Sequence, residues 1–331
     1  MFLFFGDDYI IVYLTFFMVL SVAFVNGWTD APNSVAACVS TGILPVRKAL
    51  IISAVADFLG SLTVGLFSGK VSEKIINLSS HGIGREAYLL SVFSIMLSVV
   101  IFAVFSRFFG LPTSESHAIL AGIFGTSLFI NKGFVNIDID GWVGVCKGLL
   151  ISVLTGYIFS IVFMKLLLHF LQKYKLNFSF KNIQIISGIL TSFFHGAQDS
   201  QKFVAIALSI LNENKTENSE FKITFLVAVI ISIGILTSGD KIIKTLGNDL
   251  VKLNDLQGLS ADVSGILCIL IFTLLGYPLS TTHVKTSAII GAGSINGKIN
   301  KKTASELIVS WVVTFPVCAL LSYIFARILI K

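Results

Sequence analysis

Two short polar stretches, each built around an aspartate, interrupt apolar sequence at residues 26–33 and 195–202. Carboxylate, amide and hydroxyl groups supply the oxygen ligands that hard cations such as Na+ prefer. Pro32 has no N–H group, so it also frees backbone carbonyls in the first stretch. We therefore predict that both stretches are unwound and bind a cation. The predicted cation ligands are Thr29, Asp30, Asn33, Gln198 and Asp199.

Two plainer interpretations of these stretches stay open. Asp30 can simply cap a broken helix, and Lys202 can neutralise Asp199 as a structural ion pair. The recurrence of the aspartate in both stretches favours a paired binding site over two independent structural features.

Two further stretches, 112–117 and 278–283, begin with proline, are rich in hydroxyls and open apolar runs. Proline followed by Ser or Thr is typical of a helix N-terminus, which binds anions through its free N–H groups and dipole. Two such ends, which we call the tips, would surround a tetrahedral oxyanion, although a pair of ordinary helix caps is the alternative. The predicted anion ligands are Thr113, Ser114, Ser116, Ser280, Thr281, Thr282, Gln201 and Lys202.

One acidic residue and three histidines lie in or beside these stretches. Glu115 stands where the second tip has Thr281, and a carboxylate repels an oxyanion unless a proton lies between them. Hydrogen phosphate carries such a proton and sulfate does not, so Glu115 favours phosphate. Histidine can move protons or orient hydrogen bonds. The residues predicted to affect coupling or anion selectivity are Glu115, His117, His195 and His283.

The elements that must position these residues are membrane helices. Of 331 residues, 55% are hydrophobic and only 13% charged, which is far too apolar for a soluble domain of this size. The 24 Lys and Arg residues are scattered, so no basic face for nucleic acid is expected. Apolar segments are found at 9–26, 31–45, 49–67, 88–106, 111–130, 142–170, 183–211, 221–238, 263–276, 278–295 and 307–330.

Both motif pairs recur in the same order at nearly one spacing. Asp30 and Asp199 are 169 positions apart, and His117 and His283 are 166 apart. This pattern predicts a duplicated chain, with a first repeat at 1–170, a short cytoplasmic connector at 171–182 and a second repeat at 183–331.

The charges of the loops predict that the two repeats have opposite orientations. Lysine and arginine concentrate in 171–182, in 296–306 and at Arg47, whereas loops 131–141 and 212–220 are more acidic. The positive-inside rule places the first group in the cytoplasm. We therefore predict an all-α polytopic membrane protein with an inverted-topology repeat, broken helices and about 10–12 membrane segments.

Residues 88–130 and 263–295 each contain two apolar pieces broken by a Gly-x-Pro sequence. The pieces at 263–276 and 278–295 are short for full crossings, so both regions are predicted to be re-entrant hairpins. They would enter from opposite sides, and their tips would meet near the middle of the bilayer.

The four motifs together resemble those of the PiT family of inorganic phosphate transporters, over essentially the whole chain. The resemblance implies that Asp30, Asn33 and Asp199 bind coupling ions and that the hydroxyls of both tips hold phosphate. The chain differs from many members in having Thr29 and Gln198 before the aspartates, Glu115 in place of a hydroxyl, and a short connector.

The predicted function is import of inorganic phosphate across the plasma membrane by Na+ symport through alternating access. The alternatives are a proton-coupled phosphate or sulfate permease and an uncoupled anion channel. Walker, zinc-protease and G-x-S-x-G motifs are absent from the sequence, so neither an enzyme nor a cofactor is expected. The expected partners are phosphate, Na+ or H+ and the lipid bilayer. Small residues such as those within 60–69 and 141–156 permit a homodimer.

Overall fold

A computed structural model describes residues 7–63, 83–134, 137–175, 179–211, 217–238, 240–275, 279–295 and 297–330. This part of the chain is helical and contains no strand. The helices are α1 (Asp7–Thr29), α2 (Ala36–Ser40), α3 (Val46–Ser61), α5 (Arg85–Phe108), α6 (Glu115–Ile130), α7 (Ile139–Tyr174), α8 (Lys181–Leu211), α9 (Glu217–Thr237), α10 (Asp240–Lys244), α11 (Asp255–Leu274), α12 (Thr281–Ser294) and α13 (Lys301–Leu329). A 3₁₀ turn at Ala31–Val35 joins α1 to α2, and a π-helical turn at Thr245–Leu250 follows α10.

Six helical segments within the described residues are long and apolar enough to cross a membrane. They are Tyr9–Ser40, Arg85–Phe108, Ile139–Tyr174, Asn218–Thr237, Asp255–Leu274 and Lys301–Leu329. The helices α3, α6 and α12 have 16, 16 and 14 residues, and this mixture of long and short helices is the one predicted for a chain with broken helices. The predicted polytopic all-α fold is therefore confirmed.

The packing of the helices repeats between the two halves. Equivalent pairs are α1 and α8, α3 and α9, α5 and α11, α6 and α12, and α7 and α13. Within the first half α1 packs on α5, and within the second half the equivalent helix α8 packs on α11. Four further contacts join one half to the other: α13 packs on α6, α7 on α12, α3 on α8 and α9 on α1. The halves are thus interlocked rather than side by side.

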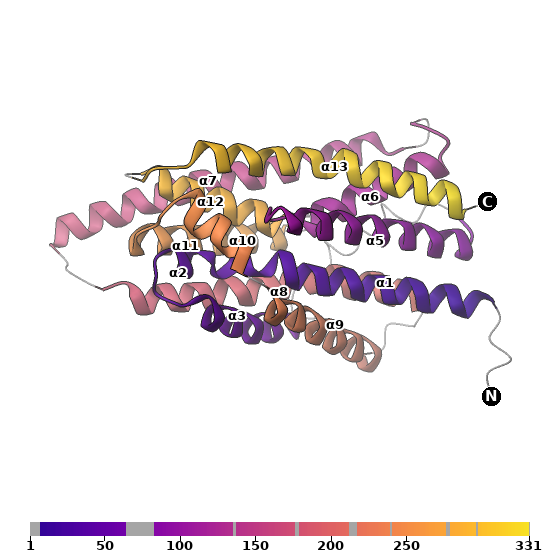
Figure 1. The fold of residues 1–331 in the computed structure, drawn as a ribbon, viewed down its shortest axis with the longest axis horizontal. Helices are drawn as coiled ribbons and strands as arrows, with labels where there is room; N and C mark the ends of the chain where they lie inside the picture. Colours follow the sequence, from indigo (N-terminus) through magenta and orange to yellow (C-terminus); the bar gives the residue numbers. More distant parts are fainter. Residues whose placement is uncertain are drawn as a thin grey trace.

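The two hairpins, α5–α6 and α11–α12, lie toward opposite ends of the molecule's long axis (Figure 1). The end of α7 and the starts of α3, α8 and α13 gather at one end, and both chain termini lie at the other (Figure 1). We call the first of these the connector end. The connections predicted to be cytoplasmic from their basic residues therefore share one end, as an inverted repeat requires.

The first polar stretch breaks its helix, and the second does not. The α1 helix ends at Thr29, and the 3₁₀ turn that follows begins at Ala31 with Pro32 as its second residue. Residues 195–202 instead lie inside the continuous helix α8. The prediction that both stretches are unwound is wrong for the second. At the position equivalent to Pro32 the second repeat has Gln201, which keeps its backbone N–H and so does not break the helix.

The first arm of the second hairpin is longer than its apolar run. The helix α11 begins at Asp255, because Asn254 and Gln257 form a capping box before the apolar residues start. Hydropathy alone therefore underestimated this arm. The Gly276-Tyr277-Pro278 break between α11 and α12 lies outside the described residues.

Glycines allow the close helix contacts on which the site depends. A Cβ at Gly27 would overlap the backbone of Ile231 on α9, and a Cβ at the equivalent Gly196 would overlap the backbone of Asp57 on α3. The backbones of α1 and α9, and of α8 and α3, therefore meet without intervening side chains. The close approach of α3 brings the Asp57 side chain beside the second polar stretch.

Two glycines of the small-residue stretches 60–69 and 141–156, which are expected to permit a homodimer contact, pack against helices of the same chain. A Cβ at Gly60 would overlap the backbone of Phe193, and a Cβ at Gly156 would press on Ser287 and Val284. These two glycines serve packing within the chain.

Candidate functional site

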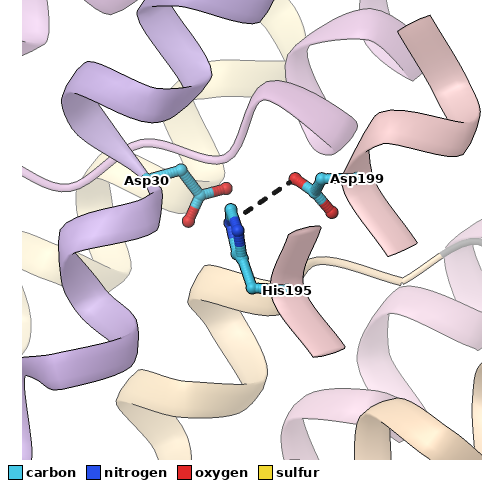
Figure 2. Close-up of side chains that lie close together, drawn as sticks. All are labelled: Asp30, His195 and Asp199. Atoms are coloured by element: carbon cyan, nitrogen blue, oxygen red, sulfur yellow. Dashed lines mark ion pairs between the residues drawn. The ribbon is translucent and has the colours of Figure 1, made fainter. Parts of the chain in front are cut away.

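The aspartates of the two polar stretches converge on one histidine. His195, from α8, lies between the carboxylates of Asp30 and Asp199, which face one another across the imidazole ring (Figure 2). One ligand atom from each of the three residues lies within 4.8 Å of the others. The His195 Nε2 atom is 3.7 Å from Asp199 Oδ2. All three side chains are buried, so this cluster is the centre of the predicted cation site.

A third aspartate, which lies outside the four motifs, completes the cluster. The Nδ1 atom of His195 is 2.7 Å from Oδ2 of Asp57, and the Asp57 side chain is fully buried. An intramembrane carboxylate is itself a signal of a functional site, and Asp57 stands alone in the apolar run 49–67. That signal was available in the sequence, but nothing in the sequence identified His195 as its partner.

Glu115, the first residue of α6, is held by side chains from the first polar stretch. Its carboxylate accepts hydrogen bonds from Thr29 (2.5 Å), Asn26 (3.4 Å) and the neighbouring Thr113 (3.4 Å). Asn26 also donates to Asp199 Oδ2 at 2.8 Å. Asn26 thus joins the first tip to the aspartate of the second stretch.

Each polar stretch contacts the tip that comes from the other half. Asn33 donates to the Thr282 hydroxyl at 3.0 Å, and the Thr281 hydroxyl lies 3.4 Å from Asp30 Oδ2. In the opposite sense, Lys202 binds the Ser116 hydroxyl as well as Asp199 Oδ1, at 2.7 Å from the latter. Predicted cation ligands and predicted anion ligands are therefore in direct, buried contact at both of these places.

Two of the predicted anion ligands act as helix caps. The Ser114 hydroxyl accepts the backbone N–H of His117 at 3.2 Å, and the Ser280 hydroxyl accepts that of His283 at 3.0 Å. The capping interpretation of these two serines is confirmed. Their hydroxyl hydrogens are still available as donors.

The two histidines of the tips meet each other instead of the aspartates. The rings of His117 and His283 are 5.2 Å apart, edge to face, and the His283 ring also lies 4.4 Å from that of Trp311 on α13, tilted by 39°. The predicted meeting of the tips is thus observed. Their contacts with the packing helix α13 favour a role in holding the tips together over a role in moving protons at the aspartates.

The two glutamines of the second stretch lie on α8 beside Asp199. Gln201 donates to the Ala197 carbonyl at 2.9 Å. The buried amide of Gln198 has no hydrogen-bond partner among the described residues, on either its oxygen or its nitrogen. A buried amide without a partner is costly, so Gln198 is a side chain that a bound ion would satisfy.

Negative groups outnumber positive ones in this cluster. Asp30, Asp57, Glu115 and Asp199 are all buried, and the basic side chains among them are His195 and Lys202. An unpaired buried carboxylate is strongly disfavoured, so the surplus must be balanced by protons or by bound cations. The cluster has the composition of a cation-binding site adjacent to hydroxyl-rich helix N-termini.

Comparison with known proteins agrees with this geometry. The model of the phosphate transporter family matches the chain twice, over residues 26–179 and again over 172–322. The chain belongs to the phosphate transporter family. The two matches cover the two halves that the motifs define.

Relatives in this family match over nearly their full length. A probable low-affinity inorganic phosphate transporter of Bacillus subtilis is 30% identical over 315 residues, which cover 92% of this chain and 93% of the relative. One of the same description from Rhizobium meliloti is 30% identical over 309 residues, or 90% of each chain. A solved structure described as "The sodium-dependent phosphate transporter" has the same fold, with a TM-score of 0.84, 21% identity and coverage of 97% of this chain and 99% of that one.

Membership of the phosphate transporter family defines the general class of activity. The protein is a multi-pass phosphate transporter of the plasma membrane, and it is not an enzyme. The ions it handles are transported substrates, and the family requires no cofactor.

Proposed function

We propose that the protein imports inorganic phosphate by symport with Na+, through alternating access around the buried polar cluster. The observation that carries this proposal is the cross-contact between the two kinds of site. Asn33 and Asp30 touch the second tip through Thr282 and Thr281. Lys202 touches the first tip through Ser116. A cation bound at the aspartates would therefore affect the groups that hold phosphate.

The surplus of negative charge explains why a cation must bind together with the anion. Phosphate brings further negative charge into a buried region that already contains more carboxylates than basic groups. A bound Na+ at Asp30 and Asp199 would offset that charge and satisfy the Gln198 amide. Each ligand then favours the other, because coupling between two sites is reciprocal.

The interlocked halves support alternating access. The site lies where the polar stretches of α1 and α8 meet the tips of α6 and α12. Hairpins that lie toward opposite ends of the molecule can open the site to one side at a time by rocking around a fixed centre. The solved transporter with the same fold is described as sodium-dependent, which supports Na+ as the coupling ion.

One observation favours a second candidate, proton coupling. His195 is held between Asp57 and Asp199, so an imidazolium there could take the place of a metal cation. In that case uptake would follow a pH gradient and would not require Na+.

Substitution of the aspartates tests the proposal. We expect Asp30→Asn and Asp199→Asn each to abolish Na+-driven phosphate uptake into proteoliposomes. Asp199→Asn also breaks the buried pair with Lys202, so its loss of uptake is read together with its thermal unfolding. Asp138→Asn is the matched control, because Asp138 caps α7 through a side-chain oxygen that asparagine retains. Full Na+-driven uptake by either site variant would contradict the assignment of the cation site.

A second substitution addresses anion choice. Glu115→Thr copies the residue of the second tip, Thr281, and leaves a hydroxyl in place of the carboxylate. We expect sulfate to compete with phosphate more effectively in this variant than in the wild type. Unchanged competition would show that Glu115 does not select between the anions.

A further inference from the structure

A second buried ion pair lies outside the site described above. Lys285 of α12 pairs with Asp262 of α11, and Ser187 of α8 donates to the other Asp262 oxygen at 2.8 Å. All three residues are buried, with Asp262 fully inaccessible and Lys285 only 2% exposed. The methylene chain of Lys285 passes Gly265, and a Cβ added at Gly265 would lie 3.6 Å from the Lys285 Cδ atom.

This ion pair lies between the candidate site and the connector end. Ser187 is six residues after the start of α8 and twelve before Asp199, or about 9 Å and about 18 Å along the helix. Lys285 is one helical turn beyond Thr281, and therefore one turn from the second tip. The ammonium group therefore stands beside α8, between the second tip and the connector end.

The face of α8 between these two places is polar throughout. Side chains that recur every three or four residues share one face of a helix. On α8 such a row is buried and polar, and it consists of Gln184, Ser187, Thr191, His195, Gln198 and Lys202. The row leads from the candidate site past the Asp262–Lys285 pair to the first turn of α8. It provides the hydrogen-bonding groups that a charged solute needs in place of water.

The first half of the chain has no such ion pair at the equivalent positions. The spacing of 166 residues between the tips aligns Asp262 with Met96 and Lys285 with Ile119. Both of these residues are buried in the apolar core. The same hairpin therefore packs with two apolar side chains in one half, and apolar groups often replace a buried ion pair without loss of stability. The fold alone does not explain the charges at 262 and 285.

We propose that Lys285 is a transient phosphate-binding site on the connector side of the transport path. An ammonium group on a flexible stem is a common ligand of phosphate oxygens. As the α11–α12 hairpin moves, Lys285 exchanges the Asp262 carboxylate for the departing phosphate. Asp262 and Ser187 recapture the ammonium group once the anion has left. This inference rests on the proposed function, because it assumes that phosphate passes between the tips.

The chain itself supplies the decisive variant. Asp262→Met with Lys285→Ile copies the residues of the first half, and it should fold because that arrangement already packs there. We expect phosphate exchange across proteoliposome membranes, with Na+ on both sides, to fall at least tenfold in this variant. Thermal stabilisation by Na+ and phosphate, which reports binding at the central site, should be unchanged.

Two further variants separate phosphate binding from a purely structural lock. Asp262→Lys with Lys285→Asp keeps an ion pair but moves the ammonium group to α11, so exchange should stay low. Lys285→Arg keeps the positive charge on α12, so exchange should be largely retained. Full exchange in the charge-reversed variant would overturn the proposal, because pairing alone would then suffice.

The outcomes also separate this inference from the proposed function. Exchange in the Met/Ile variant within twofold of wild type would overturn the role of Lys285 alone. Failure of that variant to fold would contradict the claim that the pair is dispensable for packing. Absence of phosphate exchange in the wild-type protein would overturn the proposed function, and the role of Lys285 with it.

Discussion

Replacement of Lys202 by methionine is the perturbation for which the structure gives the clearest expectation. The Lys202 ammonium group is 2.7 Å from Asp199 Oδ1, and both side chains are almost inaccessible. Removal of one partner from a buried ion pair costs about 3–5 kcal/mol. Since about 1.4 kcal/mol corresponds to a factor of ten, the unfolding equilibrium should shift by about two to three and a half powers of ten.

The same substitution should make the protein more responsive to Na+. Without the ammonium group, Asp199 lacks its closest cation, so a bound Na+ should gain affinity there. A ligand that binds only the folded state adds about 1.4 kcal/mol of stability when its concentration is ten times its dissociation constant. We therefore expect Lys202→Met to unfold at a lower temperature than wild type in choline chloride and to recover part of the difference in NaCl.

The assay is thermal unfolding of detergent-solubilised protein at matched ionic strength. Asp199→Asn with Lys202→Met should regain most of the stability but lose the response to Na+, because no carboxylate is left unpaired. Lys302→Met is the matched control, because Lys302 pairs with Glu306 in an exposed position where little effect is expected. A Lys202→Met protein as stable as wild type, or one indifferent to Na+, would refute the reasoning.

Two further predictions concern the contact between α3 and α8. Asp57→Asn removes the charged partner of His195 Nδ1, a hydrogen bond worth about 1.5–3 kcal/mol. We therefore expect phosphate uptake at limiting Na+ to fall about tenfold or more. Uptake equal to wild type would show that Asp57 is only structural. Gly196→Ala introduces a Cβ that overlaps the Asp57 backbone and should cost about 1–3 kcal/mol in thermal unfolding, whereas Gly144→Ala, which meets open space, should be neutral or stabilising. Equal unfolding temperatures for the two alanine variants would contradict the close approach of α3 to α8.

Much of this architecture could be predicted because the motifs of the first half recur in the second. The recurrence of aspartates and of Pro- and hydroxyl-rich tips at nearly one spacing predicts the duplication. The charges of the loops add the opposite orientation of the halves, from which the meeting of the tips follows. What the motifs did not predict is where the repeat departs from symmetry. Gln201 takes the position that Pro32 has in the first half. Because Gln201 keeps the backbone N–H that proline lacks, α8 continues through the second polar stretch.

The missed functional candidates share one property. Asp57, Asp262 and Lys285 are charged residues in or beside apolar runs, outside any motif, and their cost in a membrane is itself the signal. His195, the partner of Asp57, is 138 residues away, and Asp262 and Lys285 come from the two arms of one hairpin. Only the packing of α3 on α8 and of α11 on α12 reveals these pairs. The capping role of Ser114 and Ser280 was foreseen as an alternative, since the sequence of a cap and that of an anion site are the same.

Labelled phosphate uptake into proteoliposomes tests the central claim most directly. An inward Na+ gradient and an inward proton gradient are imposed separately, each with and without excess sulfate. The proposed Na+ symport predicts uptake that follows the Na+ gradient, resists sulfate and disappears in Asp30→Asn. Uptake that follows only the proton gradient, or that persists without either gradient, would contradict Na+ symport at the paired aspartates.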